Sequence, residues 1–217
     1  AMKILSPNLF ATEPIILKMK SDAKPQSIPQ PRWTVAQKEI VTRWAEEGLR
    51  NGSLEPSTSS WSSRVHLVLK PPANQTAELA DLKDCKLRPC GDYRLVNTQI
   101  EKIAPNLPTG LHQLEQASGH KIYFEADSVA CYNSFRLAAG ISREALAVWT
   151  PIGLMQPTVL PFGQKNSGTE AQGPYLLAAK KLRQVSNYVD DWLGYSDDFG
   201  ELLRHFEAFL AVCLEFN

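Results

Sequence analysis

The sequence has no apolar run that approaches the roughly 18 residues of a membrane-spanning segment. Its N-terminus also lacks the charged and then apolar pattern of a secretory signal. Hydrophobic residues make up 43% of the 217 residues and charged residues 21%, which is usual for a soluble globular protein. We therefore expect an intracellular protein without a membrane partner, built as one lobe with an insertion or as two subdomains.

Cysteine and histidine are scarce. The four cysteines, at positions 85, 90, 131 and 213, lack the paired C-x2-C spacing of a zinc site and are too few for a disulfide scaffold. The four histidines show no ligand spacing. We expect reduced thiols, most of them buried.

The chain carries no net charge, which argues against a general binder of polyanions. The two halves differ, with 14 Lys and Arg against 10 Asp and Glu in residues 1–100, and 9 against 13 in residues 101–217. A basic half and an acidic half suit a site where cationic side chains hold phosphates and carboxylates hold metal. A difference of this size is also ordinary scatter, so it supports such a site weakly.

Two adjacent acids interrupt the apolar stretch VSNYVDDWLGYS, residues 185–196. Strand-forming residues on both sides predict a hairpin with Asp190 and Asp191 at its tip. Adjacent carboxylates repel each other, and a hard divalent ion such as Mg2+ relieves that repulsion. The alternative is a surface turn, where aspartate is common because its side chain caps its own backbone.

The other elements are predicted from periodicity and from turn residues. A proline-punctuated arm is expected first, and Gly173-Pro174 should delay or kink the helix that contains it. In the first half of the chain we expect an arm at 1–33, a helix from a Thr34–Gln37 capping box to Gly52, a strand Arg64–Lys70, a short helix within 76–82 and a strand Lys86–Tyr93. In the second half we expect a helix Thr109–Ala117, a strand Lys121–Asp127, strands Phe135–Leu137 and Ala145–Thr150 around a turn at Gly140, and a helix within 160–183. The last element expected is a helix Asp198–Phe216, whose apolar face would contain Phe199, Leu202, Leu203, Phe206, Leu210 and Leu214.

Asp127 ends one predicted strand, and Asp190 and Asp191 end another. A two-metal site for nucleotidyl transfer needs carboxylates from separate elements, since they bridge ions about 4 Å apart. The sequence permits these strands to be neighbours but does not require it. Asp127 has a plainer interpretation as a cap of a turn or helix.

The order of motifs resembles the fingers and palm of a reverse transcriptase, closest to the gypsy type of long-terminal-repeat retrotransposon. The resemblance covers nearly the whole chain. It rests on GSLEPSTSSWSSRVHLVLK at 52–70, LRPCGDYRLVNTQI at 87–100, YFEADSVACY at 123–132, TPIGLMQPTVLPFGQKNSG at 150–168 and YVDD at 188–191.

The resemblance implies an RNA-directed DNA polymerase that transfers a deoxynucleotide to a primer 3'-hydroxyl. Asp127, Asp190 and Asp191 would be catalytic and would hold two Mg2+ ions, for which Mn2+ can substitute, with the backbone carbonyl of Ser128 as a further ligand. The partners implied are an RNA or DNA template-primer and a deoxynucleoside triphosphate. The location implied is the cytoplasm, including virus-like particles.

The same resemblance assigns the binding residues. Nucleotide-binding residues would be Lys70, Arg88, Ser128, Tyr132, Phe162, Gly163 and Gln164, with Tyr132 excluding a ribose 2'-hydroxyl, and template-binding residues would be Arg94 and Asn97. Each has a plain alternative: Lys70 and Arg88 as solvated strand ends, Tyr132 and Phe162 as core aromatics, Arg94 as a partner of Asp92 or Glu101, and Asn97 as a brace of the fold.

The fold implied is α+β, a palm with an antiparallel sheet and helices on one face, plus interleaved fingers. The boundaries expected are an arm at 1–33, fingers at 34–101 and 135–166, and a palm at 102–134 and 167–217. The thumb is expected to be absent, and the thumb, connection and ribonuclease H regions downstream in the same polyprotein are further partners.

Two other functions remain open. A catalytically inactive, palm-derived scaffold or nucleic-acid-binding module is favoured by the unusual segment 164–174 and by the altered fingertip loop at 71–86. An RNA-dependent RNA polymerase pairs its acids in the same way, and Tyr132 opposes it.

Overall fold

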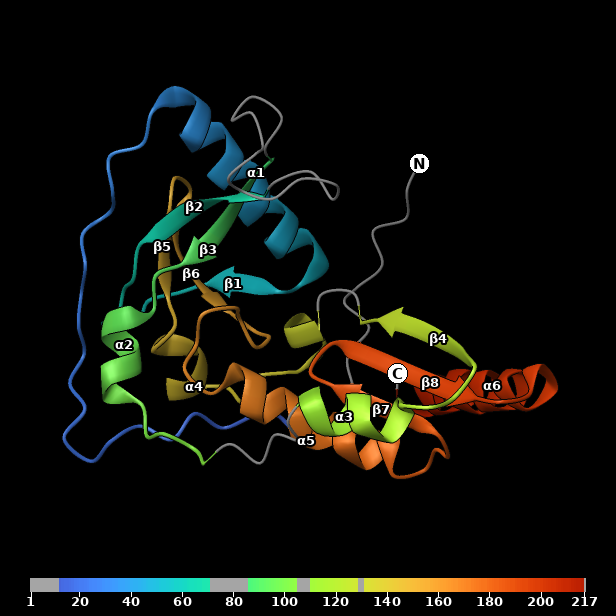
Figure 1. Ribbon diagram of the computed structural model, residues 1–217. Helices are drawn as coiled ribbons and strands as arrows, with labels where there is room; N and C mark the ends of the chain where they lie inside the picture. The colour runs from blue at the N-terminus through green and yellow to red at the C-terminus, as the bar shows by residue number, and fades with distance from the viewer. Residues whose placement is uncertain (1–11, 71–85, 105–109, 129–130, 217) are drawn as a thin grey trace. The chain divides into compact units, whose positions relative to one another are not determined.

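The computed structural model describes residues 12–70, 86–104, 110–128 and 131–216, and it contains helices and antiparallel strands (Figure 1). The helices are α1 Val35–Asn51, α2 Arg94–Gln99, α3 Gly110–Ala117, α4 Ile141–Glu144, α5 Ser167–Ala179 and α6 Phe199–Glu215, with a short 3-10 turn η1 at Cys131–Ser134. The strands are β1 Leu54–Pro56, β2 Val65–Lys70, β3 Lys86–Gly91, β4 Ile122–Asp127, β5 Val148–Thr150, β6 Gly153–Pro157, β7 Val185–Tyr188 and β8 Asp191–Ser196. None of the helices in these ranges has the length and apolarity needed to cross a membrane.

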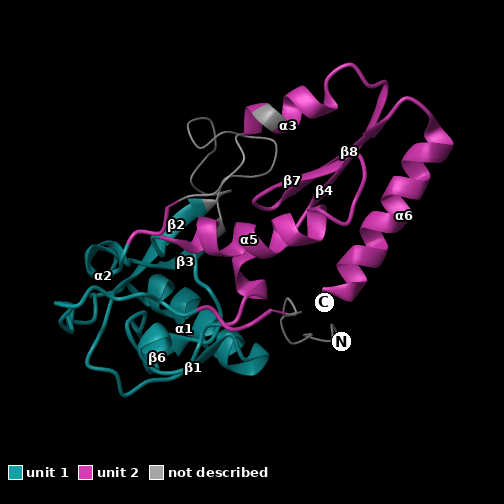
Figure 2. Ribbon diagram, turned by 90° about the horizontal axis from the view of Figure 1, so that it is seen from below, with its two compact units in different colours: residues 1–7, 16–101, 137–165 teal, residues 8–15, 102–136, 166–217 magenta. Residues whose placement is uncertain are grey.

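The chain forms two compact units, coloured separately in Figure 2. Unit 1 contains residues 16–101 and 137–165, and unit 2 contains residues 102–136 and 166–217 together with a short piece of the N-terminal arm. The chain therefore passes from the first unit to the second, returns, and passes over again. The names fingers and palm for these units remain a prediction.

Unit 1 combines a three-stranded sheet, in the order β1-β6-β5, with the β2-β3 hairpin. The predicted capping box starts α1, since the backbone N–H of Gln37 donates to the Thr34 hydroxyl and the Thr34 N–H donates to the Gln37 side chain. Gly52 ends the helix at φ 77°, a left-handed conformation that glycine adopts without strain. The predicted bounds of this helix are confirmed.

The described part of the N-terminal arm, residues 12–33, contains no helix and makes isolated bridges in place of a strand. From residue 16 on it belongs to unit 1, where the Glu101 N–H donates to the Lys18 carbonyl and the Lys20 N–H donates to the Gln99 carbonyl. The Ile28 N–H donates to the Ser62 carbonyl further along. These residues therefore form no regular element, while an arm that ends at residue 33 stays a prediction.

Unit 2 is built on a three-stranded antiparallel sheet in the order β4-β8-β7. The rings of Phe124 and Trp192 lie on one face of this sheet, because the register pairs Phe124 with Gly194 and Ala126 with Trp192. On that face Trp192 contacts Tyr175 of α5 and Phe209 of α6, with ring centroids 5.7 and 5.2 Å apart. This aromatic cluster fixes α5 and α6 on the sheet.

Several predicted elements are wrong. Residues 135–137 follow η1 and form a bend and single bridges in place of the predicted strand. Only Val148–Thr150 of the predicted strand from Ala145 is extended. Helix α2 and the strands β1 and β6 were not predicted. Both strands are short, and β1 pairs with β6 about a hundred residues away, so no local pattern marks them. The short helix expected within 76–82 falls outside the described residues.

Helix α6 has nearly the predicted bounds but buries a different face. Leu202 is buried as predicted and Phe206 packs on Phe124, but His205 and Phe209 complete the buried face, whereas the predicted Phe199, Leu203, Leu210 and Leu214 are exposed. Apolar residues surround much of this helix, so the sequence alone does not select the stripe that meets Phe124 and Trp192. The helix expected within 160–183 runs from Ser167 to Ala179 and contains Pro174, so the predicted delay of its start by Gly173-Pro174 is wrong and the predicted kink stays a prediction.

The cysteines in the described residues are free, but the expectation that most are buried is wrong. Cys131 is buried, Cys90 is partly exposed and Cys213 is exposed. Cys85 lies outside the described residues.

Gly194 provides a test of the packing in unit 2. A Cβ atom at this position would lie 2.0 Å from a ring carbon of Phe124, whose ring is held by Phe206 and Phe209. We expect Gly194→Ala to lower the free energy of unfolding by about 1–3 kcal/mol, since the ring must leave its packed position. Urea unfolding measures this, with Gly110→Ala as the control because a Cβ there meets nothing within 4 Å. Equal stability of the two variants would contradict the packing described.

Candidate active site

The strand register of unit 2 brings two of the predicted acids together. Asp127, the last residue of β4, pairs directly with Asp191, the first residue of β8. Directly opposed residues of an antiparallel pair project from the same face with Cβ atoms about 5 Å apart. Both side chains are exposed, and they lie on the face opposite Phe124 and Trp192. The sequence left open whether β4 and the acidic hairpin are neighbours, and the structure pairs them.

The third acid lies in the turn between β7 and β8. Tyr188 pairs with Asp191, so Val189 and Asp190 form a two-residue loop. The predicted hairpin is present, but its tip is one residue earlier than expected, because Asp191 already pairs as the first residue of β8. The carbonyl of Asp190 accepts a hydrogen bond of 2.8 Å from the N–H of Ser128, the residue that follows Asp127. All three acids therefore belong to the same end of the sheet, where the end of β4 is tied to the hairpin tip.

The electrostatics of this end are those of a crowded acidic group. The pKa of Asp191 is raised, first by partial burial of its carboxyl group and then by the negative charges of Asp190, Asp127 and Glu125. Glu125 is two residues before Asp127 on β4 and so projects from the same face. A cation between these groups would relieve the repulsion, as Mg2+ does when carboxylates hold it.

The acids are not arranged as a finished metal site. Within the described residues, no group of three or more His, Cys, Asp or Glu side chains lies in a position to hold a metal ion. The donor chemistry suits Mg2+ or Mn2+, because carboxylate oxygens are their preferred protein ligands. The two-ion site thus remains a prediction that requires the carboxylates to turn toward a common ion.

Tyr132 and Ser128 lie beside the acidic end. Burial raises the pKa of Tyr132, and Cys131 and the negative charge of Asp190 raise it further. The Ser128 hydroxyl accepts a hydrogen bond of 3.1 Å from the Trp192 indole N–H, which links this loop to β8. Burial, the leading cause, raises the pKa of Cys131 to about 11, so this thiol is protonated at neutral pH.

Most of the other predicted nucleotide-binding residues lie in unit 1. The guanidinium of Arg88 on β3 stacks over the ring of Phe162, 4.7 Å from its centroid. Gly163 has φ 86°, so it turns the chain after Phe162, and the Gln164 side chain that follows is buried. Lys70 is the last residue of β2, and its side chain lies outside what the structure describes.

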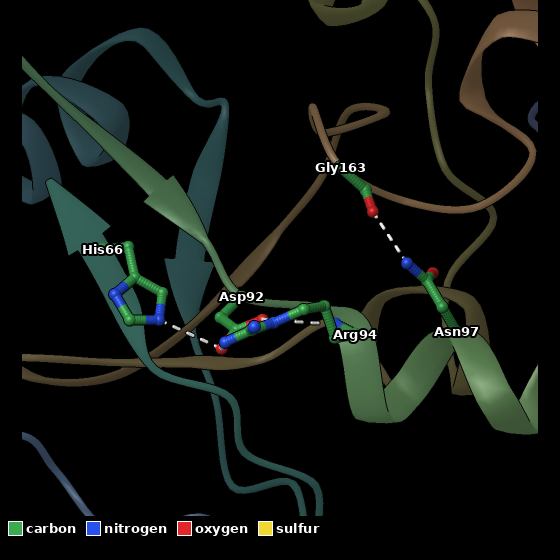
Figure 3. A network of polar contacts seen from close by, with 5 residues as sticks. All are labelled: His66, Asp92, Arg94, Asn97 and Gly163. Carbon is green, nitrogen blue, oxygen red and sulfur yellow. Dashed lines mark hydrogen bonds and ion pairs between the residues drawn. The ribbon is translucent and has the colours of Figure 1, made fainter. Parts of the chain in front are cut away.

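The two predicted template-binding residues make internal contacts (Figure 3). The exposed guanidinium of Arg94 donates two hydrogen bonds of 2.8 Å to the Asp92 carboxylate, which His66 also contacts. The Arg94 bonds, which are the leading cause, hold the pKa of Asp92 well below its usual range. The side chain of Asn97 donates to the Gly163 carbonyl at 2.8 Å. Pairing of Arg94 with Asp92, and bracing by Asn97, are thus confirmed, while template contact stays a prediction.

Three residues of these surroundings were not found from the sequence. Lys165 binds the carbonyls of Asn97 and Ile100 through its Nζ, and Gln172 and Asn187 form a buried pair at 2.8 Å in unit 2. Isolated polar residues of this kind carry no periodic signal. Their partners become known only when segments distant in the sequence are packed together.

Comparisons with known proteins relate the chain to retroviruses. No family model matches it. The Gag-Pol polyprotein of Koala retrovirus is 27% identical over 192 residues, which cover 83% of this chain and 11% of the polyprotein. The chain therefore spans a small part of the curated relative that it matches.

Solved structures of foamy virus protease-reverse transcriptase have a similar fold. The native enzyme of prototype foamy virus matches with a TM-score of 0.80 and 22% identity, over 96% of this chain and 26% of that one. The foamy viral enzyme in complex with double-stranded DNA matches with a TM-score of 0.81 and 21% identity, over 96% and 41%. The enzyme in complex with an RNA/DNA hybrid matches with a TM-score of 0.80 and 20% identity, over 96% and 26%.

Both kinds of comparison lead to the same group of proteins, while the gypsy type itself stays a prediction. The chain has the fold of a retroviral protease-reverse transcriptase region and a sequence related to a retroviral Gag-Pol polyprotein, which confirms the predicted resemblance to a retroelement reverse transcriptase.

Proposed function

We propose that this chain is part of an RNA-directed DNA polymerase and that the acidic end of unit 2 is its catalytic site. The observation that carries the proposal is the direct pairing of Asp127 with Asp191, with Asp190 in the adjoining turn. This arrangement supplies carboxylates from two separate strands at one exposed position. The likeness to retroviral proteins in sequence and fold supports the same reading.

The roles of the residues follow from their positions. Held by Asp127, Asp190 and Asp191, two divalent cations would activate a primer 3'-hydroxyl and stabilise the pyrophosphate leaving group. Ser128 offers a backbone carbonyl beside Asp127. Tyr132 lies close enough to Asp190 for that negative charge to raise the pKa of its hydroxyl. In this position its ring excludes the 2'-hydroxyl of a ribonucleotide.

The described residues contain no gathered group of three acidic ligands, and this is consistent with the proposed role. Like charges at one end of a sheet repel each other, so without a cation their lowest-energy arrangement keeps the carboxylates apart. Rotation of side chains at a strand end and in a turn needs no change of the sheet. We expect the three carboxylates to converge when the cation binds.

For unit 1 we propose that Arg88, stacked on Phe162, binds the triphosphate of the incoming deoxynucleotide. Stacking on Phe162 holds the guanidinium plane in place, and a planar guanidinium binds phosphate oxygens in a bidentate manner. The proposed nucleic-acid partner is a primer-template, as in the foamy virus complexes with double-stranded DNA and with an RNA/DNA hybrid.

A second candidate is a palm-derived scaffold that has lost turnover. It is favoured by the unusual sequence of segment 164–174 and of the fingertip loop at 71–86. Metal binding and polymerisation distinguish the two candidates.

Metal binding tests the acidic site directly. We expect the chain to bind Mn2+ and Mg2+, and Asp190→Asn to weaken binding about tenfold or more, since even groups that only support metal ligands change affinity about tenfold. Calorimetric titration measures this. Asp22→Asn, an exposed aspartate of unit 1, is the matched control and should bind like the wild type. Identical titrations of wild type and Asp190→Asn would contradict the proposal.

Triphosphate binding tests unit 1. Arg88→Ala should weaken the affinity for a deoxynucleoside triphosphate about tenfold, because a hydrogen bond to a charged group contributes about 1.5 kcal/mol or more. Fluorescence titration measures the affinity, and Arg32→Ala removes an exposed arginine of the same unit as the control. An equal loss in both variants would indicate general electrostatic attraction in place of a built site.

Nucleotide selection tests the class of polymerase. In a chain extended by the region that follows in the retroviral polyprotein, Tyr132→Ala should lower the preference for deoxynucleotides over ribonucleotides by about tenfold to a hundredfold. Primer extension with each nucleotide measures this ratio. An unchanged ratio would favour an RNA polymerase, and no product from the wild-type chain with either metal would favour the scaffold.

A further inference from the structure

The hairpin tip has a backbone conformation that its sequence does not favour. Val189 has φ 57°, in the left-handed region, which is unfavourable for a residue other than glycine. A two-residue hairpin loop with positive φ at its first position normally has glycine there. The β-branched side chain of valine makes the conformation less favourable still. Something outside the loop must therefore stabilise it.

Two buried amides hold this loop. Gln172 of α5, 1% exposed, accepts a hydrogen bond of 2.6 Å from the Val189 N–H through its Oε1. Its Nε2 donates to Oδ1 of Asn187 at 2.8 Å, and Asn187 is 2% exposed. The Nδ2 of Asn187 in turn donates to the carbonyls of Val189 and Asp191, each at 3.2 Å. Both polar groups of the strained residue are thus bonded to one pair of side chains.

The plainer interpretation is that two buried amides satisfy each other in the core. Their contacts go further, because three of the four hydrogen bonds end on the backbone of the loop and of the first residue of β8. The backbone angles of these residues set the directions in which the Asp190 and Asp191 side chains leave the chain. An amide pair that served packing alone would not need to contact the loop on both sides.

We propose that Gln172 and Asn187 are positioning residues that lock the Val189–Asp190 turn so that the two adjacent carboxylates can converge on a divalent cation. The inference rests on the proposed function, since it concerns the same acidic site. It adds that the geometry of the site is set by a helix side chain that touches neither metal nor substrate.

Hydrogen exchange tests the lock without any metal. In Gln172→Met, which keeps the side-chain volume, the Val189 amide should exchange about five- to tenfold faster, because it loses its buried acceptor. The amide of Leu193 in β8 should not change. Gln113→Met is the matched control, a buried glutamine of α3 in the same unit whose Nε2 has no hydrogen-bond partner. Unchanged exchange at Val189 would overturn the inference, whatever the metal does.

Manganese titration tests the positioning role. Gln172→Met should weaken Mn2+ binding about tenfold, as groups that orient metal ligands commonly do. Asn187→Leu should act similarly, and the double variant should lose little more than either single variant, because the two residues act as one unit. Gln113→Met should bind like the wild type. Faster exchange with unchanged Mn2+ affinity would overturn the positioning role and leave a structural one.

A rescue experiment separates strain from general loss of packing. Glycine takes positive φ at no steric cost, so in a Val189→Gly background the Gln172→Met change should weaken Mn2+ binding by a clearly smaller factor. An equal loss in both backgrounds would overturn the lock. If the wild-type chain binds no Mn2+, the proposed function and the positioning role both fail. In that case hydrogen exchange at Val189 alone decides whether Gln172 and Asn187 hold the turn.

Discussion

The register between β4 and β8 is the constraint on which unit 2 depends. It pairs Phe124 with Gly194 and Asp127 with Asp191, so it decides at once which residues enter the aromatic cluster and which reach the exposed face. A slip of one residue would exchange the two faces of a strand. Carboxylates would then face Tyr175 and Phe209, where an unpaired charge is very costly to bury. The apolar core thereby holds the acidic residues in place.

The two units contain different kinds of polar contact, one at the surface and one buried, and these differ in their effect on the conformation of the chain. In unit 1, Asp92 binds the exposed guanidinium of Arg94 at the surface, where solvent screening leaves an ion pair little net effect on stability. In unit 2, Gln172 and Asn187 are buried, where an amide without partners is costly. Buried hydrogen bonds of this kind specify one conformation of the chain, which a site made of repelling carboxylates requires.

Local patterns predicted much of the fold. The Thr34–Gln37 capping box, the alternation of residues 122–127 and the hairpin within residues 185–196 each involve neighbours in the sequence, and the structure contains all three, with the hairpin tip one residue earlier than predicted. Failures occurred where the partner is distant. The β1–β6 pairing joins residues about a hundred positions apart, and the buried face of α6 is selected by rings on β4 and β8.

The sequence by itself determined the adjacent acids of the hairpin, the acid at the end of a strand and the order of motifs that resembles a reverse transcriptase. The tertiary structure decided that Asp127 lies opposite Asp191, that Arg94 binds Asp92, and that Gln172 reaches the N–H of Val189. The physical reason is that turn and strand preferences depend on a few neighbouring residues. Strand register and buried hydrogen bonds instead depend on the packing of segments that are far apart in the chain.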